Sequence, residues 1–370
     1  MRIGFDAKRA FTNNTGLGNY SRDTIRLLSN YYLDNEYFLF TPKYINNKRL
    51  DFLNMKKNIH IKTPKSLINQ TFSSYWRSKS IVQDLIENKI DIFHGLTHEI
   101  PIGIEKTNIK SIVTIHDLIF IRFPKYFNYI DRIIYFKKFK SSCERADKII
   151  AISNQTKKDI INYFSIKENK IEVVYQGCNP IFQNHIITNY HLLKKYNLPN
   201  KFLLYVGSIE ERKNLLTLLQ VVHKLKDQHL VIIGSGKSYK TKCLNYILKN
   251  KLKKRVTVLS NLKIEELAGI YKLANIMIYP SVFEGFGIPI IEALFTKTPV
   301  ITSKDGCFSE AGGPNTKYIN PLSVLEIKNA ILEIQNSREL QKKMKLEGYR
   351  HAKNFTEKKI GENLMKIYNE

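Results

Sequence analysis

Two glutamates stand eight positions apart in the glycine-containing segment SVFEGFGIPIIEAL. Glu284 falls in an expected loop, and Glu292 falls in the first turn of a helix that Pro289 would open. Gly285 and Gly287 would let the backbone amides around them point into a pocket. Carboxylates accept hydrogen bonds from neighbouring hydroxyl groups, such as those of ribose or a hexose. An acid–base pair, a metal site and simple helix-dipole complementarity are the alternatives, and the last explains Glu292 alone.

A basic pair follows another strand-like run, in VGSIEERKNLL. Arg212 and Lys213 stand just before a helix for which Asn214 is the expected N-cap. An arginine binds two phosphate oxygens at once, a lysine acts as a point charge, and a helix N-terminus favours an anion. The pair therefore predicts a diphosphate site, although taken alone it would be interpreted as a charged turn in solvent.

A glycine loop, TGLGNYSRD, follows the first strand-like run and opens a helix. Gly16 and Gly18 would allow backbone amides to approach an anion at the helix N-terminus. The loop lacks the third glycine and the acidic residue of the dinucleotide fingerprint, so a nicotinamide cofactor is not expected. An ordinary strand-to-helix turn is the alternative.

Histidines follow two further strand-like runs. His116 and Asp117 end the first, SIVTIHDLIF. His94 and His98 follow the second, in DIFHGLTHEIP. These side chains could be catalytic, but a histidine at a strand end is more often structural. The chain has no HExxH motif, and we expect no metal cofactor.

Composition narrows the classes of function. The 59 Lys and Arg residues against 33 Asp and Glu give a formal net charge of +26, which suits nucleic acid, an anionic membrane or a phosphorylated substrate. No RNP, KH or zinc-finger pattern is present, so we do not expect nucleic-acid binding. The four cysteines form no CxxC pair, which predicts free, buried thiols. The first residues show no secretory leader, and no apolar run approaches the roughly 20 residues of a membrane span, so we expect a cytoplasmic protein.

These residues must be positioned by alternating strands and helices. Apolar runs such as RIGFDA and KSIVTIHDL alternate with helical patterns in the first half, and the alternation begins again at KFLLYVGS. This pattern predicts two doubly wound α/β domains with parallel sheets. We expect domains at 1–185 and 186–352, with a C-terminal helix over 353–370 packing towards the first domain. Ligands of such sheets bind at the carboxyl ends of the strands, where all of these motifs fall.

Together the motifs resemble the retaining glycosyltransferases of family 4, which have the GT-B fold. The spacing of Glu284 and Glu292 matches the E-x7-E motif of that family. The other matching segments occur in the family's order: GLGNYSRD, VTIHDLIFIRFPKYF, IAISNQTKKDI, VVYQGCNP, YVGSIEERKN and PVITSKDGCFSEAGG. The resemblance implies two Rossmann-like domains that face each other across a cleft, with C-terminal helices crossing back to the first domain.

The resemblance also implies transfer of a sugar from a nucleotide diphosphate donor, with retention of configuration and without a metal. Glu292 would hold the ribose and Glu284 the hexose, while Arg212 and Lys213 would stabilise the leaving diphosphate. His116 would lie near the reacting carbon. The implied catalytic residues are His116, Arg212, Lys213 and Glu284. The implied donor-binding residues are Gly16, Gly18, Ser208, Arg212, Lys213, Glu284, Gly285, Phe286, Gly287, Ile288 and Glu292. The candidates on the acceptor side are His94, His98 and Asp117.

The chain departs from many family members in having Ser208 after Gly207, where they have an arginine. The GSIEERKN version is similar to the branch that uses GDP-mannose, which favours mannose as the donor sugar and leaves a UDP-sugar open. A nucleotide-sugar epimerase is a rival, since that reaction also occurs on GT-B folds. The aromatic and basic segment YFNYIDRIIYFKKFK could rest on an anionic membrane, which would suit a lipid-linked acceptor in surface-polysaccharide assembly and a peripheral place on the inner face of the cytoplasmic membrane.

Overall fold

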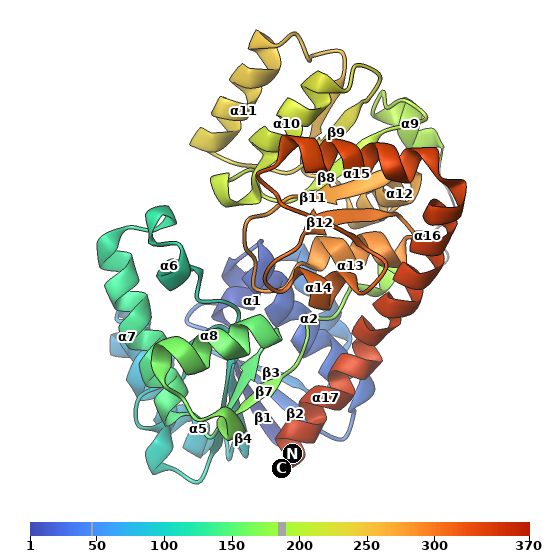
Figure 1. Cartoon of the computed structure of the whole chain (residues 1–370). Helices are drawn as coiled ribbons and strands as arrows, with labels where there is room; N and C mark the ends of the chain where they lie inside the picture. The colour runs from blue at the N-terminus through green and yellow to red at the C-terminus, as the bar shows by residue number, and fades with distance from the viewer. Residues whose placement is uncertain (46, 184–189) are drawn as a thin grey trace. The chain divides into compact units, whose positions relative to one another are not determined.

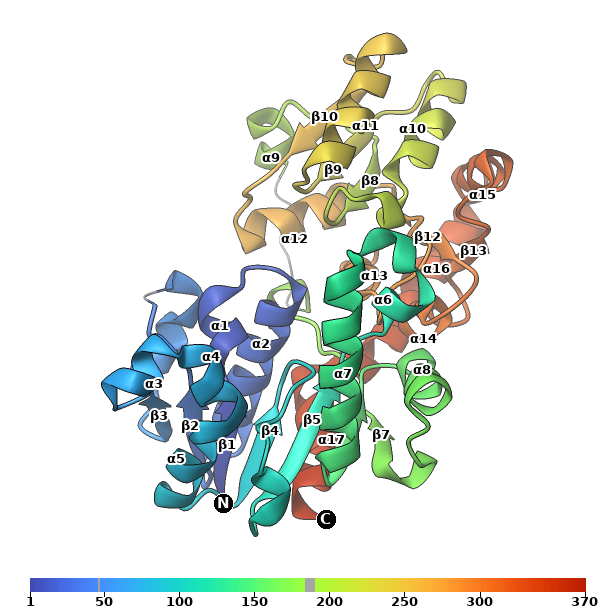
Figure 2. The ribbon, with the colours of Figure 1, turned by 90° about the vertical axis from the view of Figure 1, so that its left-hand side faces the viewer.

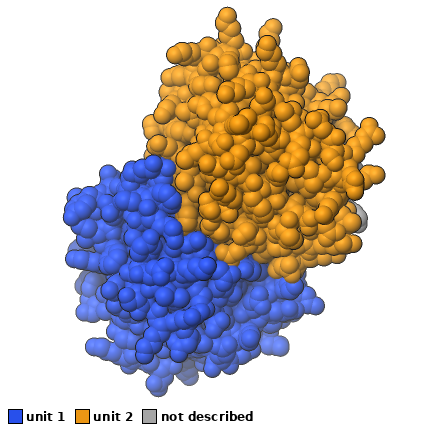
Figure 3. Space-filling model, in the orientation of Figure 1, with its two compact units in different colours: residues 1–176, 357–370 blue, residues 177–356 orange. Residues whose placement is uncertain are grey.

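The computed structural model describes residues 1–45, 47–183 and 190–370, and these fall into two compact units (Figure 3). Unit 1 comprises residues 1–176 and 357–370, and unit 2 comprises residues 177–356. The expected domain boundary at 185 lies outside the described residues. The second division falls after residue 356, where the sequence placed it after 352.

Unit 1 is built on a parallel seven-stranded sheet in the order β3-β2-β1-β4-β5-β6-β7. The strands are short and mostly buried, as expected when helices cover both faces of a sheet. The strands are β1 Arg2–Asp6, β2 Glu36–Phe40, β3 Ile59–Lys62, β4 Ile92–Gly95, β5 Lys110–Ile115, β6 Lys148–Ala151 and β7 Ile171–Val173. The order reverses between β1 and β4, which makes this pair the switch point of the sheet.

Two apolar clusters form the core of unit 1. Both contain residues from the sheet, and the helices of the unit supply the rest. These helices are α1 Lys8–Thr12, α2 Gly16–Tyr31, η1 Lys48–Met55, α3 Leu67–Thr71, α4 Ser73–Tyr75, η2 Trp76–Ser80, α5 Ile81–Glu87, η3 Ile104–Lys106, α6 Ile119–Arg122, η4 Pro124–Tyr126, α7 Tyr129–Arg145, α8 Asn154–Phe164, η5 Glu168–Lys170 and α17 Glu357–Asn369. Figure 2 shows α7, the longest of them, running alongside β5.

Unit 2 repeats this plan with a parallel six-stranded sheet in the order β10-β9-β8-β11-β12-β13. The switch point lies between β8 and β11. The strands are β8 Leu203–Val206, β9 Leu230–Ile233, β10 Val256–Leu259, β11 Ile276–Tyr279, β12 Val300–Ser303 and β13 Lys317–Ile319. The helices are η6 Pro180–Phe182, α9 His191–Lys195, η7 Glu211–Lys213, α10 Leu215–Lys224, α11 Ser238–Lys249, α12 Ile264–Leu273, α13 Ile288–Phe295, α14 Phe308–Gly312, α15 Val324–Asn336, α16 Arg338–Ala352 and η8 Lys353–Phe355. The two parallel sheets confirm the predicted pair of Rossmann-like domains.

The last helix, α17, returns the chain to unit 1, where it packs on α2 (Figure 1). Its buried side chains, among them Ile360, Leu364 and Tyr368, join the same apolar cluster as Ile3 and Phe5 of β1. The four cysteines are free and buried, as expected from the sequence. None of the helices in the described ranges is long and apolar enough to cross a membrane.

Candidate active site

The switch point of unit 2 gathers the acid and the two bases singled out in the sequence. Arg212 and Lys213 lie in the loop after β8, and Glu284 lies in the loop after β11. The Arg212 guanidinium is 2.7 Å from one carboxylate oxygen of Glu284, and the Lys213 ammonium is 2.8 Å from the other. Loops that follow two adjacent parallel strands leave the sheet at the same edge, which explains why residues about seventy positions apart meet here.

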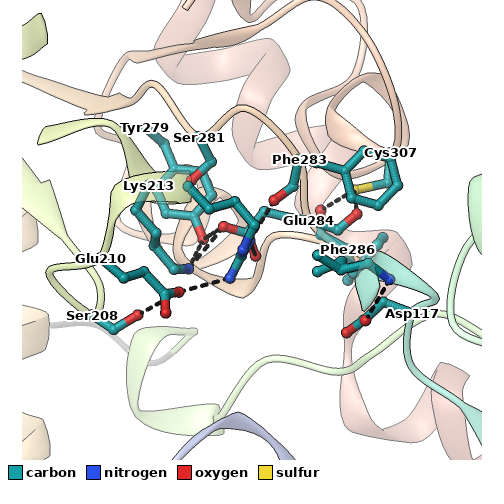
Figure 4. A network of polar contacts seen from close by, with 12 residues as sticks. Asp117, Ser208, Glu210, Lys213, Tyr279, Ser281, Phe283, Glu284, Phe286 and Cys307 are labelled. Carbon is teal, nitrogen blue, oxygen red and sulfur yellow. Dashed lines mark hydrogen bonds and ion pairs between the residues drawn. The ribbon is translucent and has the colours of Figure 1, made fainter. Parts of the chain in front are cut away.

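A tyrosine that the sequence did not single out completes this cluster (Figure 4). Tyr279 ends β11, and its hydroxyl donates to Glu284 at 3.0 Å while it accepts from Lys213 at 2.6 Å. Although burial raises the pKa of Glu284, Lys213 and Arg212 outweigh it and lower the pKa to about 2. Glu284 is therefore an anion at ordinary pH, so it can accept hydrogen bonds but cannot serve as a proton donor.

The backbone holds the two loops together. The Val282 amide donates to the Arg212 carbonyl at 2.8 Å, and the Arg212 guanidinium donates to the Phe283 carbonyl. On the other side of the loop, the Cys307 thiol donates to the carbonyls of Glu284 at 3.2 Å and Phe286 at 2.9 Å. The acid and the two basic residues are thus held together by backbone contacts as well as by their ion pairs.

Glycines are required where these loops turn. Gly207 has a φ of +150°, and a side chain there would begin 3.3 Å from the Lys213 side chain. Gly287 has a φ of +123° directly before α13, a conformation that residues with a side chain rarely adopt. Gly285 is buried beside it, and Ile288 is the first residue of α13.

Ser208 and Glu210 form the outer part of the cluster. The Ser208 hydroxyl donates to Glu210 at 3.0 Å, and Arg212 pairs with the same carboxylate at 2.7 Å. Burial lowers the pKa of Arg212, but the carboxylates of Glu284 and Glu210 raise it by more. The net pKa lies above its usual value, so Arg212 remains charged. The two cations are therefore balanced by two carboxylates in this structure. An incoming diphosphate would have to displace at least part of this pairing.

Glu292 lies in α13, where it accepts a hydrogen bond of 2.8 Å from the buried Tyr271 hydroxyl of α12. The expectation that Glu292 occupies the first turn is wrong, because α13 begins at Ile288 and Glu292 is its fifth residue. Dipole complementarity acts within the first turn and therefore does not account for Glu292. Asn214 is the N-cap residue of α10, as expected, but it is in the left-handed region. Its side chain contacts Thr217 and Pro321 instead of a helix amide.

The remaining candidates lie in unit 1. His116 accepts from Gln176 at 3.2 Å through Nδ1 and donates from Nε2 to the Leu96 carbonyl at 2.9 Å, the tautomer that satisfies both contacts. Burial lowers the pKa of His116 to about 4, so the ring is neutral at pH 7. It stands edge-on to Tyr20. A proton-transfer role would need this pKa to rise, whereas a neutral ring suits contact with a sugar.

His94 and His98 have different surroundings. His94 is fully buried, and its two ring nitrogens contact Tyr368 at 2.6 Å and Thr114 at 2.7 Å, so it holds α17 to the sheet and is not placed to meet an acceptor. His98 has a φ of +69° and stacks on Phe139, and its buried Nδ1 has no hydrogen-bond partner among the described residues. His98 therefore remains an acceptor-side candidate.

Asp117 and Gly18 have local structural roles, and Gly16 does not. Asp117 accepts from the Ile119 amide at 3.0 Å, which starts α6. A side chain at Gly18 would begin 1.8 Å from the Asn13 carbonyl oxygen, and the Gly18 amide already donates to the Asn13 side chain at 3.2 Å. Gly16 faces open space. Close packing thus explains Gly18, whereas Gly16 keeps the expected access to a ligand. Among the described residues, no group of three or more His, Cys, Asp or Glu side chains is arranged to hold a metal ion.

Two protein-family models together match most of the chain. The family model described as "Glycosyl transferases group 1" matches residues 192–351, and the model "Glycosyltransferase Family 4" matches residues 15–181. The O-antigen chain mannosyltransferase RfbU of Salmonella typhimurium is 28% identical over 64% of this chain and 63% of its own length. The O-antigen chain mannosyltransferase B of Escherichia coli is 26% identical over 72% and 70%.

The fold matches solved structures over its whole length. Alr3699/HepE of Anabaena, solved in complex with UDP, superposes with a TM-score of 0.78 at 16% identity, covering all of both chains. The two family models together span both units, and each unit has the sheet order expected of a Rossmann-like domain. The chain therefore belongs to the family 4 glycosyltransferases of the GT-B fold.

Proposed function

We propose that the protein transfers a hexose, with mannose from GDP-mannose as the first candidate, to a glycan or lipid-linked acceptor in surface-polysaccharide or lipopolysaccharide assembly. The observation that carries the proposal is the pair Arg212 and Lys213, held by Glu284 at the switch point of unit 2. The two O-antigen mannosyltransferases named above support mannose and this class of acceptor.

In the proposed reaction, the bond between the anomeric carbon and the diphosphate breaks, and the electron pair leaves with the diphosphate. Arg212 and Lys213 stabilise the charge that develops on the leaving group. No metal is needed in this role if both cations reach the phosphates. Glu284, as a permanent anion, accepts hydrogen bonds from hexose hydroxyls, and Glu292, oriented by Tyr271, accepts them from ribose. Retention of configuration follows if the acceptor hydroxyl attacks the anomeric carbon on the face that the diphosphate leaves. The new C–O bond forms there, and the hydroxyl proton passes to an oxygen of the leaving diphosphate.

The donor is tested by the thermal stabilisation that UDP-, GDP- and ADP-sugars give to the purified protein. GDP-mannose should raise the melting temperature most. A larger shift with UDP-sugars would favour the alternative donor, which the UDP complex of Alr3699/HepE supports. Radiolabelled sugar incorporated into product, with its anomeric configuration analysed, separates a transferase from a nucleotide-sugar epimerase, which would change the sugar without an acceptor.

Two variants test the site assignment. Glu292→Ala should weaken nucleotide binding, because the ribose loses a hydrogen-bond acceptor. Lys213→Ala should chiefly slow transfer, by about 100-fold or more, because its charge acts on the leaving group. The exposed Lys254→Ala is the matched control for a lost positive charge. Wild-type transfer rates in both site variants would refute the assignment.

We also propose that α7 binds the anionic lipids of the inner face of the cytoplasmic membrane. The side chains of Tyr129 and Ile130 are 71% and 70% exposed, and Ile134 is exposed one turn later. Three lysines follow on the same helix: Lys137, Lys138 and Lys140. Apolar contact and attraction to anionic lipids together favour such binding. Alanine at all three lysines should reduce sedimentation with phosphatidylglycerol vesicles, and unchanged binding would refute the idea.

A further inference from the structure

Unit 1 contains a cavity whose lining includes Lys137 and Lys138, two of the lysines proposed above for membrane contact. Its volume is about 310 Å³. It lies at the switch point of the unit 1 sheet, because Asp6 is the last residue of β1 and Glu99 follows β4. Open α/β sheets bind their ligands at this place. The charged side chains that line it are Asp6, Arg77, Glu99, Lys137, Lys138 and Arg145.

Ion pairs and hydrogen bonds hold two arginines of the cavity lining in place. Arg77 comes from η2, a short π-helix, and pairs with Asp6 at 2.7 Å and Glu99 at 3.2 Å. Segments of π-helix are rare and are found frequently at functional sites. Arg145 of α7 also lines the cavity, and it donates to the carbonyls of Pro101 at 2.6 Å and Ile100 at 3.2 Å. It also pairs with Glu105, at 3.3 Å. Side chains held in this way present their charge at a fixed position.

The lining has an excess of positive charge. Four cationic side chains face two carboxylates, and both carboxylates already pair with Arg77. Lys138 shares Glu99 with Arg77, at 3.4 Å. Within the described ranges, no carboxylate pairs with Lys137. The cavity therefore has unused capacity for an anion, and a phosphate is the anion that clustered arginine and lysine side chains bind best.

Exposed apolar side chains lie close to the lysines of the cavity. Ile102 lines the cavity and is 52% exposed, and the exposed Ile134 precedes Lys137 and Lys138 by one turn of α7. Exposed lysines next to exposed apolar side chains suit a phosphate that is attached to a hydrocarbon chain. The volume lies at the lower end for ligand pockets, so it suits a headgroup and not an entire glycan.

We infer that this cavity binds the phosphate or diphosphate group of the acceptor, in unit 1 and separately from the donor diphosphate. The inference rests on the proposed glycosyl transfer and narrows its acceptor to a phosphate-bearing molecule. A lipid headgroup and a free glycosyl phosphate share this chemistry.

Inorganic pyrophosphate is the probe, titrated calorimetrically into the full chain with saturating GDP present to occupy unit 2. The wild type should bind pyrophosphate, and Lys137→Gln/Lys138→Gln should bind at least tenfold more weakly. Ser141→Asp, which adds a carboxylate to the cavity wall, should also lose binding. Lys140→Gln is the control, because this lysine of α7 is not part of the cavity and pairs only weakly with Glu144, at 3.9 Å.

The inference is overturned if the wild type does not bind pyrophosphate under these conditions, or if the cavity variants bind it as tightly as the control. Geranyl phosphate, geraniol and inorganic phosphate then separate the sources of the group. Tighter binding of geranyl phosphate than of inorganic phosphate supports a lipid headgroup, and equal binding supports a free glycosyl phosphate. Binding of geraniol as tight as that of geranyl phosphate would refute a phosphate site.

Failure of the proposed function would look different. In that case nucleotide sugars would not stabilise the wild type at all, whatever the result with pyrophosphate. If nucleotide sugars stabilise the wild type and the cavity variants equally, the donor site is intact, and a change in pyrophosphate binding reports on the unit 1 cavity alone.

Discussion

At the scale of single residues, Glu284 shows how a carboxylate in a basic protein can be both a structural and a binding group. Its two oxygens pair with Arg212 and Lys213. These pairs keep Glu284 ionised and also keep two cations close together that would otherwise repel each other. Its low pKa keeps both oxygens ionised, and an ionised carboxylate accepts stronger hydrogen bonds from hydroxyl groups than a neutral carboxyl does.

Glu284→Gln tests this role through the pH dependence of stability. The pKa of Glu284 is lowered from 4.5 to about 2 in the folded protein, so its charge stabilises the fold above about pH 4.5. This contribution is lost as the pH falls from about 4.5 towards 2. We expect the variant to lose about 3 kcal/mol at pH 7, because the buried Lys213 loses its carboxylate partner and Arg212 keeps only Glu210. Its stability should also change less than that of the wild type over this acidic range.

Urea unfolding at several pH values provides the measurement. Glu211→Gln is the control, since Glu211 is exposed in the same loop and no ion pair is found for it among the described residues. Identical pH profiles for the wild type and Glu284→Gln would show that the ion pairs do not set the charge of this site.

The glycines of the first loop make a second prediction at this scale. An alanine methyl at Gly16 would meet no atom within 4 Å, whereas at Gly18 it would lie 1.8 Å from the Asn13 carbonyl oxygen. Gly18→Ala should therefore lose about 1–3 kcal/mol of stability. Gly16→Ala should keep the wild-type melting temperature but slow sugar transfer by about tenfold or more, because the methyl enters space proposed for the donor. Wild-type transfer by Gly16→Ala would remove this residue from the donor site.

The sequence predicted which residues lie near each other when their strands position them, but it did not predict the contacts of their side chains. Arg212, Lys213 and Glu284 each follow a buried apolar strand, and strand ends meet at one edge of a parallel sheet, so their proximity was predictable. Their ion pairs were not, because strand position does not give the direction of a side chain. Tyr279 was missed for a related reason. In the sequence it is one more residue of an apolar strand, and only the contacts of its hydroxyl with Lys213 and Glu284 show that it belongs to the cluster.

At the scale of elements, strongly apolar runs predicted most strands correctly, whereas some short or polar elements were not predicted. The strand β13, Lys317–Ile319, was missed because no longer apolar run contains it: an asparagine and a proline follow it at once. The π-helix η2 has no sequence pattern that distinguishes it from an α-helix, so the rigid place of Arg77 was not foreseen. The cavity of unit 1 depends on that element and was missed with it.

The contact between α17 and the sheet yields a prediction at this scale. The Tyr368 hydroxyl lies 2.6 Å from Nδ1 of the buried His94, so Tyr368→Phe would leave that nitrogen without its partner. We expect a loss of about 1–3 kcal/mol in the free energy of unfolding, measured in urea. Tyr129→Phe removes a hydroxyl from a side chain that is 71% exposed and should leave stability unchanged. Equal stability of both variants would refute a structural role for His94.

At the scale of the whole molecule, two sheets with the same strand order place their switch points between β1 and β4 in unit 1 and between β8 and β11 in unit 2. The cation–carboxylate cluster follows β8 and β11, and the cavity follows β1 and β4. Each unit thus has its own place for a ligand. The order of the chain connects the folding of the two units, because unit 1 is completed only by residues 357–370, which follow the whole of unit 2.

This arrangement predicts that the two units can be destabilised separately. Ile360 and Leu364 are almost fully buried in the core of unit 1, and each change to alanine should cost about 2–5 kcal/mol. In calorimetry, Ile360→Ala/Leu364→Ala should unfold unit 1 at a lower temperature, whereas the transition of unit 2 should remain and should still shift upward with GDP-mannose. The control is Asn363→Ala, an exposed position of the same helix. A single transition lowered as a whole, with the nucleotide shift lost, would mean that unit 2 does not fold or bind its donor without an intact unit 1.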